Sequence, residues 1–307
     1  MTRVNEKFTN KIMALAASFG VVTMGVASGA PASAQNSTNT AAAFLPSSPD
    51  DLAARATYAD FVTLAESSDV VARVRIRRQS TLEPERAPGL EPGFARLYIE
   101  ADTLALIAGT TRIGESLSYL VDVPLNAKGK PLKLKKREML LFASASGRGP
   151  KGETQLQLAA PNAQLAYSAA LEQRVRPVLA SLVEPGQPPI ITGIRDALAV
   201  PGTLTGESET QIFLKTKDSS PVSITVLRRP GQPPAWGVSW GEIIDSSARA
   251  PQRETLRWYR MACALPDSLP SATNLARDPG ARRLAATDYG FVINALGDCT
   301  RAITKAP

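Results

Sequence analysis

Pairs of carboxylates near aromatic side chains are the residues whose types and spacing in this chain suit hydrolysis. Glu207 and Glu209 lie one residue apart just before an alternating segment, and Glu242 and Asp245 follow Trp240. Two carboxylates at a suitable separation cleave glycosidic bonds, and carboxylates also bind cations. The same four acids equally suit the solvated ends of strands. Both interpretations stay open on the sequence alone.

A segment with strand periodicity has apolar residues at every second position: Trp236, Val238 and Trp240. These three side chains therefore share one face. An exposed pair of indole rings beside acids would form a platform for stacking a sugar. A buried pair would instead be part of the core of a sheet.

Basic residues gather in two places, and both suit an anionic partner. Arg73, Arg75, Arg77 and Arg78 form the outward face of a predicted strand. A denser run places six cations within ten residues: Lys128, Lys130, Lys133, Lys135, Lys136 and Arg137. We interpret this run as a candidate anion-binding site, with a solvated basic surface as the alternative. Aromatic residues, which single-strand binders interleave with cations, are absent here, which disfavours nucleic acid.

Many catalytic classes are excluded by what the sequence lacks. The chain contains no histidine, which removes Ser-His-Asp and Cys-His catalysis and histidine-ligated metal sites. The segment from Gly147 to Gly152 is rich in glycine but lacks the spacing of a phosphate-binding loop. We therefore predict no catalytic residue, no metal site and no cofactor.

The two cysteines, Cys263 and Cys299, are expected to form one disulfide. The alternative is a free nucleophilic thiol, but no histidine is present to activate it.

The first 34 residues have the pattern of an export signal. Arg3, Lys7 and Lys11 precede a mainly apolar stretch at residues 12–26, and Ala32-Ser33-Ala34 matches a signal-peptidase site. Removing residues 1–34 lowers the net charge from +7 to +5. No later stretch is apolar for about 18 residues, so no transmembrane span is expected after cleavage. We predict a periplasmic or secreted protein whose residues 35–50 form a flexible N-terminus.

Strand periodicity dominates residues 51–145. Apolar residues alternate from Val70 to Ile76, a loop rich in proline and glycine follows, and further strands are expected at 94–107, 117–123 and 139–143. This spacing favours a small antiparallel OB-like β-barrel. A segment rich in glycine and serine, Ser144–Gly152, is the predicted boundary of this part.

Residues 153–307 are expected to form an α+β region. After a further strand near residue 156, Pro161 is predicted to open a helix that Pro177 kinks or divides. An antiparallel meander is expected across residues 190–240. Two helices, at 252–263 and 279–303, are predicted to be joined by the disulfide. The fold class is therefore α+β and β-rich: an OB-like barrel followed by an antiparallel sheet with flanking helices.

Two resemblances accompany these patterns. The segment Glu66–Val74, with the strands that follow it up to residue 143, resembles the opening of netrin-like OB barrels, although the cysteines of that family are absent. The segment 190–266, with Trp236-Gly-Val-Ser-Trp240 and Trp258-Tyr-Arg-Met-Ala-Cys263, resembles a group of exported Gram-negative bacterial proteins without an assigned function. The first resemblance implies a fold and the second implies export.

Taken together, the sequence predicts an exported, envelope-associated binding or structural protein. An anionic envelope polymer is the expected class of partner, held by the cations from Lys128 to Arg137. The alternative is a hydrolase that uses carboxylates to act on cell-envelope polymers.

Overall fold

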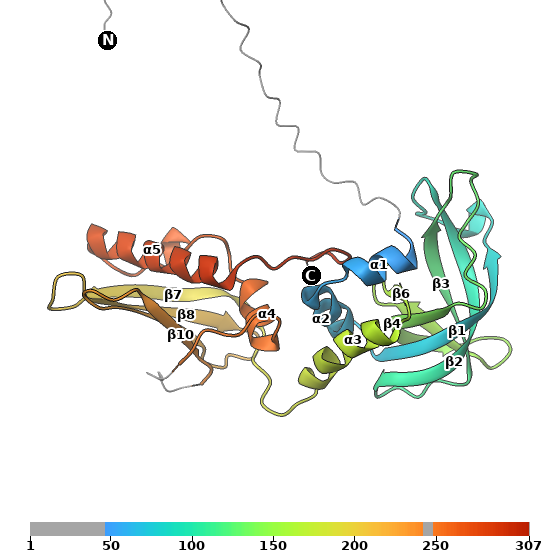
Figure 1. The fold of residues 1–307 in the computed structure, drawn as a ribbon, viewed down its shortest axis with the longest axis horizontal. Coiled ribbons are helices and arrows are strands. Elements are labelled where there is room, and N and C mark those ends of the chain that lie inside the picture. The colour runs from blue at the N-terminus through green and yellow to red at the C-terminus, as the bar shows by residue number, and fades with distance from the viewer. Residues whose placement is uncertain (1–46, 242–247, 307) are drawn as a thin grey trace, which may run out of the picture. The chain divides into compact units, whose positions relative to one another are not determined.

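Five strands close into a barrel in the first half of the chain (Figure 1). The structure, a computed structural model, describes residues 47–241 and 248–306. The predicted signal sequence and residues 35–46 lie outside the described residues. The predicted flexible N-terminus, residues 35–50, was too long, because helix α1 (Pro49–Arg55) begins inside it with Ser48 as its N-cap. The barrel strands are β1 (Val70–Thr81), β2 (Phe94–Gly109), β3 (Ser116–Pro124), β4 (Glu138–Arg148) and β5 (Thr154–Leu158).

The order of strands around the barrel is β1-β2-β3-β5-β4, and β4 pairs again with β1 to close it. β3 and β5 are parallel, whereas the other neighbours are antiparallel. This closed five-stranded arrangement is compatible with an OB-like barrel. Together with the separate sheet described below, it confirms the predicted α+β, strand-rich class.

The barrel extends beyond residue 145, where the sequence placed its end. β4 continues to Arg148 and β5 follows after a tight turn, in which the Gly149 N–H donates to the Glu153 carbonyl at 2.8 Å. The glycine- and serine-rich segment is therefore the end of one barrel strand and the turn into the next. The sequence pattern is the same for a turn and for a linker, because both need residues that tolerate unusual backbone angles.

The barrel interior is filled by the apolar phase of each strand. Leu97, Ile99 and Ala101 of β2 are fully buried, as their alternation predicts. Residues 139–143 of β4 are all buried, which explains why that strand is a continuous apolar run. One polar pair lies inside: the Tyr119 hydroxyl donates to Gln164 at 2.7 Å.

Short helices and a short strand flank the barrel. β6 (Gln164–Ala166) pairs with β4, and α3 (Ala169–Ser181) begins at the N-cap Ser168. The predicted helix start at Pro161 was therefore wrong, because β4 recruits residues 164–166 as a strand. The other two helices are α1 (Pro49–Arg55) and α2 (Tyr58–Glu66).

A separate four-stranded antiparallel sheet follows in the order β10-β9-β8-β7. It is the antiparallel meander predicted across residues 190–240. α5 (Pro279–Leu296) lies along one face of it, as Figure 1 shows. The strands are β7 (Ile191–Pro201), β8 (Ser208–Thr216), β9 (Ser223–Arg228) and β10 (Ala235–Ser239).

The C-terminal helices are shorter than predicted. α4 spans Leu256–Ala262, and α5 ends at Leu296 because Gly297 takes a φ of 66°, which favours glycine. Cys299 thus lies in the segment after α5, not on the helix. None of the helices in the described ranges is long and apolar enough to cross a membrane.

Candidate functional site

The candidate anion-binding run lies on the connection between β3 and β4. Buried Leu134 anchors this connection against the barrel. The Gln79 side chain of β1 fixes its backbone, accepting from the Leu134 N–H at 2.5 Å and the Lys135 N–H at 3.2 Å, and donating to the Leu132 carbonyl at 3.0 Å. The loop is therefore held in one conformation by a side chain from another strand.

Five lysines project from this connection, and all five are exposed. None of their ammonium groups makes an ion pair or hydrogen bond with any residue that the structure describes. We call this set the lysine loop: Lys128, Lys130, Lys133, Lys135 and Lys136. Arg137 departs from the set, because its guanidinium binds Asp50 of α1 at 2.5 Å.

In the other basic cluster, on β1, three of the four arginines are paired with acids of neighbouring strands, and Arg78 makes no salt bridge with a described residue. Arg73 and Arg75 both bind Glu138 of β4, each at 2.6 Å, and Arg77 binds Asp102 of β2 at 3.1 Å. Hydrogen bonds from Arg75 and Arg73 hold the pKa of Glu138 below its ordinary value. This strand face therefore carries less unbalanced positive charge than its four arginines would suggest.

A hollow of about 720 Å³ lies on the outer wall of the barrel. The pairing register places Ser80 of β1 opposite Tyr98 of β2, and Tyr98 opposite Leu120 of β3. We call it the barrel hollow. Its lining includes Ser80, Glu83, Arg86, Tyr98, Ser118, Leu120, Ser146, Gln155 and Gln157.

One wall of the barrel hollow comes from the loop between β1 and β2, which includes the short helix η1 (Pro84–Arg86). The loop is held on the barrel because the Leu82 N–H donates to the Arg96 carbonyl at 2.9 Å. The Arg96 guanidinium in turn donates to the Pro88 carbonyl at 3.1 Å and forms a two-pronged ion pair with Asp122 of β3. These contacts give the hollow a defined shape.

The predicted acid pair before β8 lines a second hollow. Glu207 and Glu209 share this space of about 650 Å³ with Arg228 and Arg229. Among the described residues no tryptophan lines it, since Trp236 and Trp240 pack against the core. Both tryptophans are partly buried, which agrees with the core interpretation only in part. Glu242 and Asp245 lie outside the described residues.

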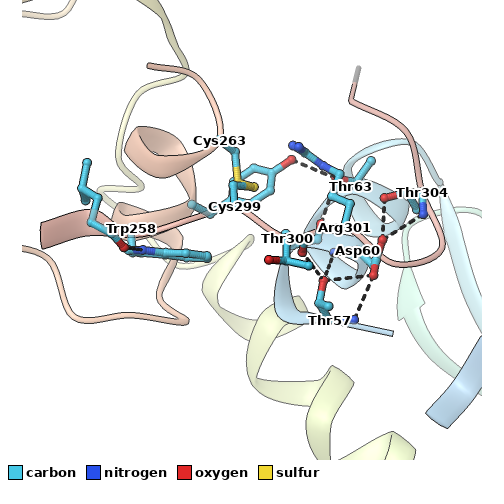
Figure 2. The surroundings of a disulfide bond; sticks show 12 residues. Thr57, Asp60, Thr63, Trp258, Cys263, Cys299, Thr300, Arg301 and Thr304 are labelled. Carbon is cyan, nitrogen blue, oxygen red and sulfur yellow. Dashed lines mark hydrogen bonds between the residues drawn. A yellow bond between two sulfur atoms is a disulfide. The ribbon is translucent and has the colours of Figure 1, made fainter. Parts of the chain in front are cut away.

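The predicted disulfide between Cys263 and Cys299 is present, with the two Cα atoms 5.1 Å apart. The segment that follows Cys299 is bound by Asp60 of α2 (Figure 2). One Asp60 oxygen accepts from the N–H groups of Ile303 and Thr304 and from the Thr304 hydroxyl, at 2.7–3.2 Å. The other accepts from the Ala302 N–H at 3.0 Å and from Thr57.

These bonds decide the ionisation of Asp60, whose side chain is fully buried. Burial by itself raises the pKa of Asp60, but the hydrogen bonds from Thr57, Ala302, Thr304 and Ile303 outweigh it and hold the pKa below its ordinary value. Asp60 is thus a buried anion that anchors the C-terminal segment, which is a structural role.

Sequence analysis missed both Asp60 and the barrel hollow. A local signal for Asp60 existed, because Thr57 and Asp60 have the spacing of a capping box at the start of a helix. A signal for the hollow also existed in part. Tyr98 occupies the outward phase of β2, between the buried Leu97 and Ile99, and an aromatic residue at an outward position calls for an explanation.

The comparisons with known proteins leave the identity open. No protein-family model and no curated protein matches this chain. Within the described ranges, no cluster of three or more histidine, cysteine or acidic residues is arranged to hold a metal ion.

Proposed function

We propose that the protein is an exported, envelope-associated binding protein that holds an anionic polymer on its lysine loop. One observation carries this proposal: five exposed lysines lie on a loop fixed by Gln79, and their charges are not balanced by any described acid. Arg73, Arg75 and Arg77 of β1, by contrast, are paired with Glu138 and Asp102. Unbalanced charge at one place attracts a polyanion, whereas paired charge does not.

The binding mode follows from the exposure of these lysines. Ammonium groups in water interact over about 8 Å at physiological ionic strength, so binding should depend steeply on salt. Each lysine near a dense anionic surface contributes about 1 kcal/mol. Several lysines acting together therefore give useful affinity without a deep cleft, which suits a long, repetitive ligand such as an acidic glycan.

The proposed compartment is the periplasm or the outside of the cell. A disulfide persists in an oxidising environment, so the Cys263–Cys299 bond supports this proposal. The closed five-stranded barrel is compatible with the OB-like fold that the resemblance to netrin-like barrels implies.

The export prediction has a direct test. When the full chain is expressed with its own N-terminus, we expect the exported protein to begin at Gln35, because Ala32-Ser33-Ala34 matches a signal-peptidase site. N-terminal sequencing or intact mass of the secreted or periplasmic fraction measures this. A mature protein that still begins at Met1 would contradict the prediction that the chain is exported and cleaved.

The lysine loop is tested by the triple variant K133Q/K135Q/K136Q. We expect its affinity for polygalacturonate, an acidic glycan, to fall by roughly tenfold or more, because three of five unbalanced charges are lost. Wild-type affinity should also fall as NaCl rises from 50 to 500 mM. Titration calorimetry measures both, and the melting temperature should change little since all three side chains are exposed.

The matched control is K215Q/K217Q/K305Q, which removes the same charge from three exposed lysines elsewhere. It should bind polygalacturonate nearly as the wild type does. Equal losses in the two triple variants would show that net charge alone matters. Salt-independent binding, or full affinity in K133Q/K135Q/K136Q, would refute the lysine loop as the site.

The alternative, a hydrolase that uses carboxylates, has weaker support. Glu207 and Glu209 do line a hollow, but it lacks the neighbouring tryptophan that the sugar-platform hypothesis requires. Glycoside hydrolysis also needs a carboxyl group whose pKa is raised so that it can act as an acid. Among the described carboxyl groups with a shifted pKa, every shift is downward. We therefore favour binding.

A further inference from the structure

The barrel hollow combines an apolar platform with polar side chains. Tyr98 and Leu120 face outward, directly opposite each other on β2 and β3. Leu120 is 45% exposed, which is unusual for a leucine in a barrel wall. The Tyr98 hydroxyl contacts Glu153 at 3.3 Å, which limits rotation of the ring. The two side chains form a fixed apolar patch at the base of the hollow.

Hydrogen-bonding groups surround this patch, and several are unused. The carboxamides of Gln155 and Gln157 on β5 make no hydrogen bond with a described residue. The Ser118 hydroxyl, beside Gln155 in the pairing of β3 with β5, is almost fully buried and lacks a partner among the described residues. The two carboxamides are therefore available to the hydroxyls of a ligand, whereas the Ser118 oxygen has almost no exposed surface.

The hollow has no excess of positive charge, since Glu83 offsets Arg86 and the Glu153 carboxylate lies against the Tyr98 hydroxyl. Glu83 and Arg86, both on the loop between β1 and β2, are its only charged lining residues among those described. They carry one negative and one positive charge. A ligand with a phosphate at every unit, such as single-stranded nucleic acid, finds no excess of cations here. A neutral ligand does not need one.

The pairing of the strands also restricts the ligand. An extended peptide usually binds by adding a strand to a free sheet edge. At this wall β2 is paired on both sides, with β1 and β3, so it has no free edge, and β3 pairs with β5 only over residues 117–119. A ligand that lies on Tyr98 of β2 is therefore recognised through side chains, with its face on Tyr98 and Leu120.

From these features we infer that the barrel hollow binds a neutral saccharide. A pyranose ring has an apolar C–H face that packs on an aromatic ring, and a rim of hydroxyls that suits carboxamides and serine hydroxyls. The volume of about 720 Å³ falls within the range of small-molecule sites, about 300–1,000 Å³. Four strands spaced about 4.8 Å apart span roughly 14 Å, enough for a short oligosaccharide. This site is separate from the lysine loop and goes beyond the function proposed above.

The test uses three neutral trisaccharides, maltotriose, cellotriose and chitotriose, with the mature protein in titration calorimetry. We expect at least one to bind, with an affinity unchanged between 50 and 500 mM NaCl because no ionic contact is involved. Tyr98→Ala should weaken that binding about tenfold, and Tyr98→Phe, which keeps the ring, by no more than about threefold. The double variant Q155A/Q157A should weaken it about tenfold.

Two further variants keep the test decisive. Leu120→Ser removes the exposed half of the platform without touching the barrel interior, and it should weaken binding several-fold even if Tyr98→Ala folds poorly. Leu104→Ala changes another exposed leucine of β2, outside the hollow, and should leave binding unchanged. Failure of all three trisaccharides to bind, or full affinity in both Tyr98→Ala and Leu120→Ser, would overturn the inference. Saccharide binding should persist in K133Q/K135Q/K136Q, which separates this site from the lysine loop.

Discussion

Replacing Asp60 with alanine is expected to lower the free energy of unfolding by about 3–5 kcal/mol, because several buried hydrogen-bond donors lose their acceptor at once. Six hydrogen bonds end on the two oxygens of this carboxylate: two from Thr57, two from Thr304 and one each from Ala302 and Ile303. Urea unfolding followed through the fluorescence of Trp258, a buried indole that donates to the Leu296 carbonyl, measures the loss.

Asparagine at position 60 should be nearly as damaging as alanine. Each carboxylate oxygen accepts three hydrogen bonds, two of them from backbone N–H groups, so an amide nitrogen in place of either oxygen would face two backbone donors. Asp102→Ala is the matched control, because it removes an acid of β2 whose ion pair with Arg77 is half exposed. It should cost less than about 1 kcal/mol. A loss that small in Asp60→Asn would refute the anchoring role.

The contribution of Asp60 should depend on pH in a definite direction. Its pKa in the folded protein lies below its ordinary value of 3.8, so the stabilisation is fully present above that ordinary value and is lost as pH falls through the lower, folded value. The stability difference between wild type and Asp60→Asn should therefore be constant from pH 7 to about 5 and shrink below about 4. A difference that grows on acidification would contradict this sign.

Local patterns in the sequence predicted most of the strands. The alternation of apolar and polar residues in β1 and β2 indicates that one face of each strand is buried. The unbroken apolar run in β4 indicates that both of its faces are buried. The meander from β7 to β10 was predictable for the same reason, since short turns join strands that are neighbours in sequence. These elements need only the periodicity of side chains and the chemistry of turns.

Closure of the barrel was not predictable in the same way. It depends on β5 pairing in parallel with β3 and antiparallel with β4. The parallel pair brings together Ser118 and Gln155, which are far apart in the sequence, and five residues of alternating pattern do not specify such a partner. The barrel hollow lies across this pairing, which explains why the sequence indicated Tyr98 as outward but not the site around it.

The partners of the charged residues could not be predicted from local sequence either. All six cations from Lys128 to Arg137 look equivalent in the sequence, yet Arg137 is paired with Asp50, which lies 87 residues earlier. Likewise Asp288, fully buried in the middle of α5, binds Arg228 of β9 at 2.6 Å. Neither acid carries a local signal of its partner. Which charges remain available to a ligand is therefore a property of the fold.

Removing the disulfide is expected to cost about as much stability as removing Asp60, but through the unfolded state. The Cys263–Cys299 bond spans a sequence separation of 36 residues. In the chain-entropy model, a loop of this length stabilises the folded state by roughly 3–4 kcal/mol. We expect that loss in the double variant C263A/C299A, measured by the same urea unfolding. A loss below about 1 kcal/mol would indicate that the bond constrains the unfolded chain little.

A second measurement distinguishes the two effects. Asp60 holds the segment 302–304 directly, whereas the disulfide acts just before it, and Arg301 lies between them with its side chain on Thr63 (Figure 2). In C263A/C299A the hydrogen bonds to Asp60 remain, so trypsin should cleave after Arg301 nearly as slowly as in the wild type. In Asp60→Ala those bonds are gone, so the segment can open locally without the cost of breaking them. Cleavage after Arg301 should therefore accelerate at least tenfold under native conditions. Faster cleavage in C263A/C299A than in Asp60→Ala would mean that the disulfide, not the buried carboxylate, holds the C-terminal segment on α2.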